Sequence, residues 1–163
     1  MLTRRTFLKT SAAVSLATAM GGLLPPAPAW AAGDTVRRSE AEWRKRLSAD
    51  AYDVLRQAGT ERPFTSPLLD EHRAGIFACA GCDLPLFDAK TKFDSGTGWP
   101  SFWQPLDRAV VQTVDATLGM TRNAVECRRC AGHLGHVFDD GPKPTGLRYC
   151  MNGVALAFVA AAA

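Results

Sequence analysis

Apolar and polar positions follow three different patterns along the chain. An uncharged run extends from Thr10 to Gly33, and it is followed from Ser39 to Ala58 by apolar positions that recur at helical spacing among charged ones. From Arg62 onward, glycines and prolines divide the sequence into short β-prone runs. The patterns therefore predict an apolar leader, then a helical segment, then antiparallel β-structure.

The helical segment predicts two short helices. Ser39 and Ser48 each suit the N-cap position, where a side-chain oxygen accepts a hydrogen bond from the first turn. Trp43 and Leu47 are four residues apart, so they lie on one helical face. We expect that face to pack against the rest of the domain.

The β-rich part contains four recognisable short runs, Gly75–Phe77, Ala109–Val114, Thr117–Arg122 and Gly135–Phe138. Turn-forming residues separate them, which is typical of antiparallel strands. The sequence contains no internal repeat of useful length and no low-complexity linker. We therefore expect one mainly β domain with short helices near its N-terminus.

The uncharged run has the features of a secretory signal peptide. Its apolar centre, Ala12–Leu24, is too short to cross a bilayer as a stable helix and is followed at once by prolines. Ala29 and Ala31 form an A-x-A type cleavage site, although a cut after Ala29 is an alternative. The sequence predicts a signal peptide over residues 1–31 and a single domain over residues 32–163, with no stable membrane insertion after cleavage.

Two adjacent arginines indicate the route of export. Arg4 and Arg5, followed by Phe7, Leu8 and Lys9, resemble the twin-arginine signal, which exports folded proteins in bacteria. An ordinary secretory signal with two neighbouring arginines is the alternative. We expect a periplasmic or otherwise exported protein.

Removal of the leader changes the charge balance. The full chain has 19 basic and 16 acidic residues, and residues 1–31 contain three of the basic ones and none of the acidic ones. The mature chain is therefore formally neutral, with 16 residues of each sign. Its charge gives no support for binding to nucleic acid or to anionic membranes. Its length, about 132 residues, is enough for one domain with one core.

Four of the five cysteines form two C-x-x-C pairs, Cys79 with Cys82 and Cys127 with Cys130. Each pair brings two sulfurs together, and two pairs supply the four thiolates that zinc prefers in a closed structural site. Two disulfides, or one redox-active C-x-x-C pair, are the alternatives that an oxidising compartment leaves open. We predict one structural Zn²⁺ that joins two distant hairpins.

The fifth cysteine, Cys150, is left without a partner. An unpaired thiol in an exported protein pairs between chains, lies buried or reacts. Arg148 and Asn152 place a cation and an amide near it, and a nearby positive charge increases the thiolate fraction. These residues alone leave two interpretations open, a catalytic nucleophile and an inert buried thiol.

Two further clusters are candidates for chemistry. His133 and His136 suit proton transfer near neutral pH, with structural hydrogen bonds or a mixed zinc site as alternatives. The run Gly96–Trp103 holds aromatic residues, among them Trp99 and Phe102, in a glycine-containing turn. Such aromatics often form the wall of a pocket for an apolar group, and core packing is the alternative.

Together and in this order, the motifs resemble the B-type methionine-R-sulfoxide reductase family. The resemblance extends from about Ser39 to Phe158 and includes RQAGTERPF from Arg56, GTGWPSF from Gly96, HLGHVFDDGP from His133 and PTGLRYCMN from Pro144. It implies a mainly β fold of two antiparallel β-sheets with short N-terminal helices. It also implies that one zinc ion is bound by Cys79, Cys82, Cys127 and Cys130.

The resemblance further implies roles for individual residues. Cys150 would be the nucleophile, and Trp99 would lie against the substrate methyl group. His136 and Asn152 would handle the sulfoxide oxygen, with His133 close by. Phe102 and Arg148 are additional candidates for substrate contacts.

The implied reaction is thiol-dependent reduction of the R epimer of methionine sulfoxide, mainly within oxidised proteins. Cys150 would pass through a sulfenic acid. Many members have a resolving cysteine at the position of Thr97, and this chain has none there. We therefore expect a one-cysteine cycle in which a thioredoxin-like protein or a small thiol reduces the enzyme. A second departure is Gly153, where serine is more usual.

Two other classes of protein remain as alternatives. One is a zinc-stabilised binding module in which Cys150 is inert. The other is a thiol–disulfide oxidoreductase that uses Cys79 and Cys82.

Overall fold

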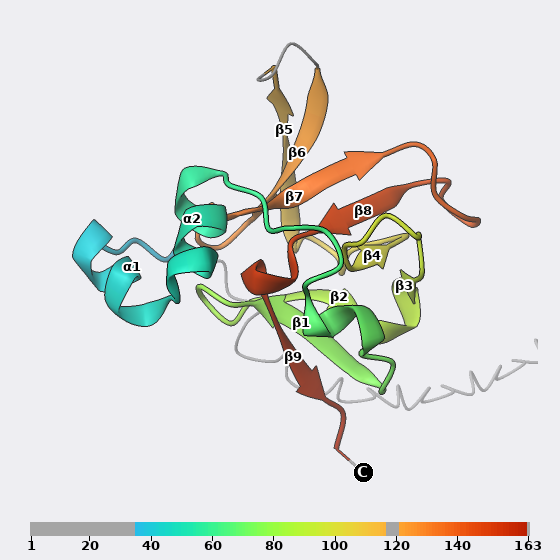
Figure 1. Cartoon of the computed structure of the whole chain (residues 1–163), viewed down its shortest axis with the longest axis horizontal. Coiled ribbons are helices and arrows are strands. Elements are labelled where there is room, and N and C mark those ends of the chain that lie inside the picture. The colour runs from blue at the N-terminus through green and yellow to red at the C-terminus, as the bar shows by residue number, and fades with distance from the viewer. Residues whose placement is uncertain (1–34, 117–120, 163) are drawn as a thin grey trace, which may run out of the picture.

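The computed structural model describes residues 35–116 and 121–162 (Figure 1). Its helices are α1 (Glu40–Arg46) and α2 (Ala49–Gln57), with short 3₁₀ turns η2 (Pro67–Asp70), η3 (Ala89–Thr91) and η5 (Gly153–Ala155). Its strands are β1 (Gly75–Cys79), β2 (Pro85–Asp88), β3 (Lys92–Phe93), β4 (Ser101–Phe102), β5 (Val110–Asp115), β6 (Arg122–Cys127), β7 (His133–Phe138), β8 (Arg148–Met151) and β9 (Leu156–Ala160). Within these residues, no helix is long and apolar enough to cross a membrane.

The two predicted helices and both of their caps are confirmed. Ser39 and Glu42 form a capping box at the start of α1, and the Ser48 side chain accepts from the backbone at the start of α2. Trp43 is buried and Leu47 packs against the core, as expected for one inward face. α2 packs against β7 and η5, so the helices cover one end of the β-domain.

The strands form two antiparallel sheets, which confirms the predicted fold class. One sheet has three strands in the order β2-β1-β9, and the other has six in the order β3-β4-β8-β7-β6-β5. In the smaller sheet, Gly75 at the start of β1 pairs with Ala160 at the end of β9. The C-terminal part of the described chain therefore closes the domain against its first strand (Figure 1).

One predicted strand lies largely outside the described residues. Of the run Thr117–Arg122, residues 117–120 lie outside the described residues, and β6 begins only at Arg122. The strand continues to Cys127 because Ala124 and Val125 are buried there. The runs Gly75–Phe77, Ala109–Val114 and Gly135–Phe138 correspond to β1, β5 and β7.

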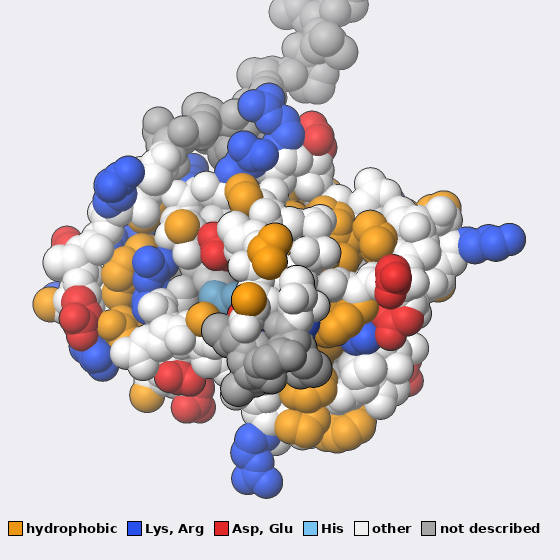
Figure 2. Space-filling model, turned by 90° about the horizontal axis from the view of Figure 1, so that it is seen from above, with side chains coloured by type: hydrophobic (Ala, Val, Ile, Leu, Met, Phe, Trp, Pro, Cys, Tyr) orange, Lys and Arg blue, Asp and Glu red, His pale blue; other side chains and the backbone are white. Residues whose placement is uncertain are grey.

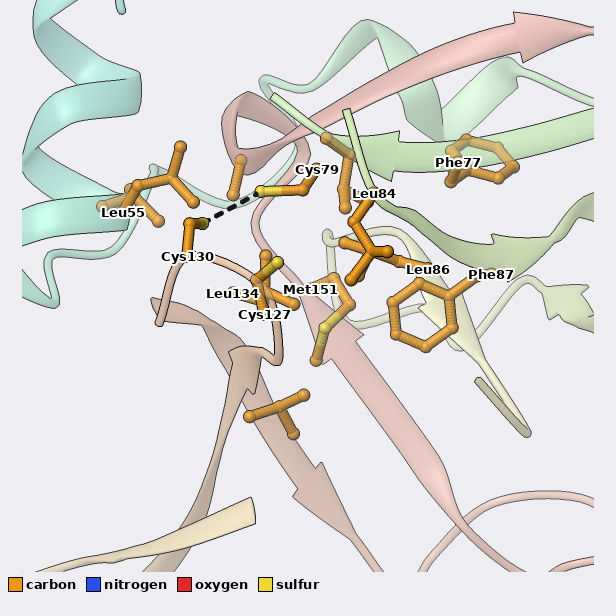
Figure 3. Close-up of a cluster of buried hydrophobic side chains, with 14 of the residues drawn as sticks. Leu55, Phe77, Cys79, Leu84, Leu86, Phe87, Cys127, Cys130, Leu134 and Met151 are labelled. Atoms are coloured by element: carbon orange, nitrogen blue, oxygen red, sulfur yellow. Dashed lines mark hydrogen bonds between the residues drawn. The ribbon is translucent and has the colours of Figure 1, made fainter. Parts of the chain in front are cut away.

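Aromatic side chains from both sheets form the core. Phe102 from the larger sheet stacks on Phe87 at a ring distance of 4.3 Å and contacts Phe77 edge-on at 5.0 Å. Met151 and Leu134 are also fully buried (Figure 3). Burial of each such side chain contributes roughly 1.5–3 kcal/mol, so this layer fixes which face of the larger sheet turns inward.

Candidate functional site

The four cysteines of the C-x-x-C pairs converge on one point. Their Sγ atoms all lie within 4.8 Å of one another, and all four side chains are buried. Cys79 ends β1 and Cys127 ends β6, whereas Cys82 and Cys130 lie in the turns that follow. The cluster joins the two sheets beside the core and could hold a metal ion (Figure 3).

The geometry of this cluster bears on the two alternatives for its cysteines. Cys79 Sγ lies 3.7 Å from Cys130 Sγ, and Cys82 Sγ lies 3.5 Å from Cys127 Sγ. Both separations are far beyond the roughly 2.05 Å of a disulfide bond, and all five cysteines are free. Cys79 has no exposed surface and Cys82 has 5%, so this pair lacks the accessible thiol of a redox-active site.

Arginines from the two helices hold the cysteine turns in place. Arg46 Nε of α1 donates to Gly81 O at 2.7 Å, and Arg56 of α2 donates to Cys130 O at 2.9 Å. The Arg56 guanidinium also lies 5.0 Å from the centre of the Trp43 ring. The helices therefore satisfy turn carbonyls that the sheets do not reach, and they fix the sulfur positions from outside.

Cys150 lies in the middle of the larger sheet, away from this cluster. Its strand β8 runs between β4 and β7, and Cys150 pairs with Ser101 on one side and with His136 on the other. Cross-strand partners point to the same face of a sheet. Cys150 is partly exposed, unlike the other four cysteines. A thiol, a hydroxyl and an imidazole thus form one row on the same face of the sheet, with Cys150 and His136 partly exposed and Ser101 buried.

A glycine allows β7 to approach β8 beside Cys150. A Cβ atom on Gly135 would lie 2.1 Å from Cys150 O and 3.0 Å from Met151 Cα, so no other residue fits without a backbone shift. The β6–β7 pairing also changes register next to this glycine. The His133 and His136 rings consequently lie edge to face, 5.2 Å apart.

A cation lies on the same face as Cys150. Arg148 precedes it by two residues on β8, donates to both carboxylate oxygens of Asp140 at 2.8 Å, and lies 4.4 Å from the centre of the Phe138 ring. Burial raises the pKa of the Cys150 thiol, whereas a hydrogen bond from Thr97 and the charge of Arg148 oppose that rise. The polar neighbours therefore favour the thiolate against the effect of burial.

The ring of His136 is oriented by a carboxylate. His136 Nε2 lies 2.8 Å from Asp115 Oδ2, and Arg122 donates to the same oxygen at 2.7 Å. Asp115 ends β5 and Arg122 begins β6, so the far end of this hairpin fixes the imidazole. In Figure 2, a histidine side chain reaches the surface among hydrophobic ones, with acidic and basic side chains interspersed around them.

His133 lies deeper than His136. It is 8% exposed, and burial together with the neighbouring charge of His136 lowers its pKa to about 4. Its Nε2 has no hydrogen-bond partner within the described residues. His133 is therefore neutral near pH 7, and its ring supports the ring of His136.

Asn152 is buried immediately after β8 and connects three segments. Its Nδ2 donates to Leu134 O at 3.0 Å, and its Oδ1 accepts from Glu61 N at 3.0 Å. Glu61 O in turn accepts from Trp99 Nε1 at 3.2 Å, and the Glu61 carboxylate accepts from the backbone of Gly153 and Val154. The structure thus brings Asn152 and Trp99 together through Glu61.

Glu61 has no assigned role in the sequence interpretation, although it lies within the RQAGTERPF motif. The only signal for it was its place in that motif, because its backbone partners Gly153 and Val154 are about ninety positions away.

The structure also explains why position 153 holds glycine. A Cβ on Gly153 would lie 1.8 Å from Ser66 Oγ, so the Ser66 side chain occupies the space that a larger residue at position 153 would need.

The aromatic residues of the glycine-containing turn divide between surface and core. Trp99 is partly exposed, whereas Phe102 has no exposed surface and stacks on Phe87. Phe102 pairs with Tyr149 rather than with Cys150, so its side chain points to the opposite face of the sheet. The structure therefore places Phe102 in the core and does not bring it to Cys150.

Comparisons with known proteins agree with this arrangement. Residues 47–160 match the SelR domain family. The chain is 58% identical over 118 residues to a peptide methionine sulfoxide reductase MsrB of Pseudomonas putida, covering 72% of this chain and 89% of that protein. The proteins of the same name from Agrobacterium fabrum and Bradyrhizobium diazoefficiens are each 52% identical, over 124 and 134 residues. These matches cover 76% and 82% of this chain, and 92% and 96% of the relatives.

The leader also has a match. Residues 1–21 match the signal sequence of the twin-arginine translocation pathway. This match confirms the predicted export by the twin-arginine route.

Proposed function

The chain belongs to the SelR domain family and is a peptide methionine sulfoxide reductase, and on this premise we propose that Cys150 is the nucleophile. The row of Ser101, Cys150 and His136 carries the proposal, because it places the one thiol outside the metal cluster beside an imidazole on an accessible face. Arg148 adds a positive charge that favours the thiolate.

The net reaction transfers one oxygen atom from the substrate sulfur to Cys150. The thiolate attacks the sulfoxide sulfur and forms an S–S bond while the sulfoxide oxygen takes up one proton. The resulting hydroxyl group passes from the substrate sulfur to the Cys150 sulfur as the S–S bond breaks, so methionine leaves and Cys150 becomes a sulfenic acid, the reversible first step of thiol oxidation. The Cys150 sulfur loses two electrons and the substrate sulfur gains them.

His136 donates the proton to the sulfoxide oxygen. Imidazole is suited to this step near neutral pH, and the Asp115 carboxylate at 2.8 Å holds the ring in one orientation. Asn152, two residues after Cys150, orients the backbone at the oxygen site through its bonds to Leu134 and Glu61. His133 positions His136 by ring contact.

The substrate is the R epimer of methionine sulfoxide, mainly in oxidised proteins. Trp99 provides the apolar surface for the methyl group, because it is partly exposed and its indole nitrogen is held by Glu61 O. An aromatic ring fixed at one edge presents its face without loss of rotamer freedom on binding. Arg148 lies on the substrate side of the sheet, and Phe102 acts only through the core.

An external thiol returns Cys150 to the reduced state. The other four cysteines are committed to the buried cluster, and position 97 holds threonine. A thiol of a thioredoxin-like protein or of a small molecule attacks the sulfenic acid, which releases water and forms a mixed disulfide. A second thiol then releases Cys150.

The metal in the cluster is zinc. Four thiolates at Zn–S distances of about 2.3 Å in a tetrahedron lie about 3.8 Å apart, close to the 3.5 and 3.7 Å between sulfurs here. Its role is structural, because all four ligand side chains are buried and four thiolates leave no coordination position open for a substrate. The ligands are Cys79, Cys82, Cys127 and Cys130.

Maturation follows from the leader. Residues 1–31 are removed on export, and residues 32–163 form the single mature domain. Twin-arginine export of a folded chain allows zinc to bind in the reducing cytoplasm, before the thiols meet an oxidising compartment.

The test uses zinc-loaded mature protein with peptides that carry either the R or the S epimer of methionine sulfoxide, and dithiothreitol as electron donor. Wild type should reduce only the R epimer, and Cys150→Ser should be at least about a thousandfold slower, because the attacking sulfur is lost. The variant should retain its zinc and its melting temperature. Activity that survives the substitution, or is absent from both proteins, would support the zinc-stabilised binding module. Insulin reduction by the same samples would support the thiol–disulfide oxidoreductase.

A further inference from the structure

Three hydroxyl side chains form a continuous hydrogen-bonded path that ends at Cys150. Thr97 Oγ1 lies 3.9 Å from Cys150 Sγ and 2.8 Å from Ser95 Oγ. Ser95 Oγ lies 2.7 Å from Ser101 Oγ. At the other end, Ser101 Oγ donates to the carbonyl oxygen of Trp99 at 3.1 Å. Ser101 is fully buried, so the path runs from the thiol into the protein.

When Cys150 carries its proton, all four hydrogen bonds of this path form, and each is donated away from the thiol toward Trp99 O. The thiol donates to Thr97, and Thr97 donates to Ser95. Ser95 donates to Ser101, which donates to Trp99 O. Four hydrogens then meet four acceptors. Because each hydroxyl has a single hydrogen, no other arrangement makes all four links.

When the thiol loses its proton, the sulfur becomes an acceptor and the Thr97 hydroxyl must turn to donate to it. In the fully reversed chain, Thr97 donates to the thiolate, Ser95 donates to Thr97, and Ser101 donates to Ser95. Each hydroxyl hydrogen rotates about its C–O bond, and no proton passes between heavy atoms. Trp99 O and Ser101 Oγ no longer accept a hydrogen bond, while the sulfur gains one in its charged state, so three of the four links remain.

We propose that Thr97, Ser95 and Ser101 form a reversible hydroxyl chain that stabilises the thiolate of Cys150, with Thr97 as the positioning residue that supplies the donor. A hydrogen bond to a charged group is stronger than one between neutral groups, and linked hydrogen bonds polarise one another where the dielectric is low. The inference rests on the proposed role of Cys150 as nucleophile. It gives the threonine at position 97 a function in a one-cysteine enzyme.

Charged groups also face Cys150 from two strands. Arg148 lies on β8 itself, and His136 is the cross-strand neighbour on β7. β4 contributes the hydroxyl of Ser101 at this position. Substitutions at position 97 leave Arg148 and His136 unchanged, so a comparison among position-97 variants isolates the hydroxyl.

The test measures the rate at which iodoacetamide alkylates Cys150 as a function of pH, in folded zinc-loaded protein, by mass analysis of the peptide that contains Cys150. Thr97→Val removes the hydroxyl at nearly constant volume. We expect its profile to move to higher pH and its rate at pH 7 to fall about tenfold, as for loss of one hydrogen bond to a charged group. Thr97→Ser keeps the hydroxyl and should remain within about twofold of wild type.

Two outcomes would overturn the proposal: a Thr97→Val profile that superimposes on wild type, or equal shifts in the Val and Ser variants. Thr97→Ala adds no atoms and serves the same comparison if the valine variant does not fold. Alkylation requires no catalysis. If the profiles shift as expected but wild type reduces no sulfoxide, the proposed function fails and the hydroxyl chain stands.

Discussion

The four clustered cysteines and Cys150 are the same residue type in opposite surroundings. The cluster is buried, and its sulfurs have one another as nearest polar partners. Cys150 is partly exposed, and its polar partners are a hydroxyl and a guanidinium. A fully buried set of four thiols suits a metal ion that stabilises the fold, whereas a thiol with one solvent-exposed side is suited to attack a substrate. The contrast shows that surroundings decide what a thiol does in this protein.

The two regions also differ in how the chain builds them. Each C-x-x-C turn is local, because two ligands lie three residues apart at the end of a strand. The Cys150 row instead needs β4, β8 and β7, which are brought together only by sheet pairing. Loss of the cluster should therefore affect stability, and changes around Cys150 should affect chemistry.

Removal of the metal should have the largest effect. A structural zinc in a four-thiolate site contributes on the order of 10 kcal/mol or more to folding, comparable with the stability of a whole domain. We expect a strong chelator, or Cys127→Ser, to abolish cooperative thermal unfolding followed by circular dichroism, with zinc content measured in parallel. Cys150→Ser is the matched control and should unfold like wild type. An unchanged melting temperature after loss of the metal would mean that packing alone holds the sheets together.

Substitution of His136 should have the next largest effect, on activity alone. His136→Asn removes the proposed proton donor but keeps a polar side chain, and loss of general acid catalysis lowers rates about 10²–10⁴-fold. We expect a fall of this size in kcat for the R epimer, with unchanged zinc content. Asp115→Asn, which only loosens the ring, should have a smaller effect. If kcat were unaffected in His136→Asn, the proton would have to come from elsewhere.

The difference between local and long-range contacts explains which parts of the fold the sequence could predict. The helices were predictable because Ser39 and Ser48 cap them locally. β8 and β9 were not among the runs predicted as strands; in β8, Arg148, Tyr149 and Met151 become buried only through the neighbouring strands. The run Thr117–Arg122 lies mostly outside the described residues, and β6 extends beyond it to Cys127.

The same difference between local motifs and long-range strand pairing applies to the candidate site. The four cysteines of the cluster were singled out by their spacing alone, and the structure brings them together. His136 and Arg148 were named as candidates, but their partners Asp115 and Asp140 depend on strand pairing and a loop. Glu61 was missed because its hydrogen bonds span about ninety residues. Phe102 was grouped with Trp99 by proximity in sequence, although Phe102 lies in β4 with its side chain in the core and Trp99 lies in the preceding turn, partly exposed.

Acidification should lower the free energy of unfolding by a smaller amount, through protonation of His133 in the unfolded chain. The pKa of His133 is about 4 in the fold against an ordinary 6.5, so between these values the unfolded chain binds more protons and the free energy of unfolding rises with pH. Acidification from pH 6.5 to 4 should therefore remove on the order of 2–3 kcal/mol. His133→Asn cannot bind the proton, and the difference between variant and wild type in urea unfolding at several pH values isolates this residue. Parallel pH dependence in both proteins would contradict the assignment.

The smallest expected change in rate comes from Thr97→Cys, which gives Cys150 a neighbouring thiol such as each clustered cysteine has. Thr97 Oγ1 lies 3.9 Å from Cys150 Sγ, so a thiol at position 97 would need only a shift of about 2 Å to reach the 2.05 Å of a disulfide. After one turnover without reductant, wild type should hold a sulfenic acid that reacts with dimedone, whereas Thr97→Cys should hold an internal disulfide instead. Turnover with dithiothreitol should change by only about a few-fold, because the external thiol then attacks a disulfide rather than a sulfenic acid. Peptide mass mapping separates the two products, and Thr97→Ser is the control. An internal disulfide to Cys150 in wild type would mean that the metal cluster gives up a cysteine, and the separation between the two kinds of thiol would not hold.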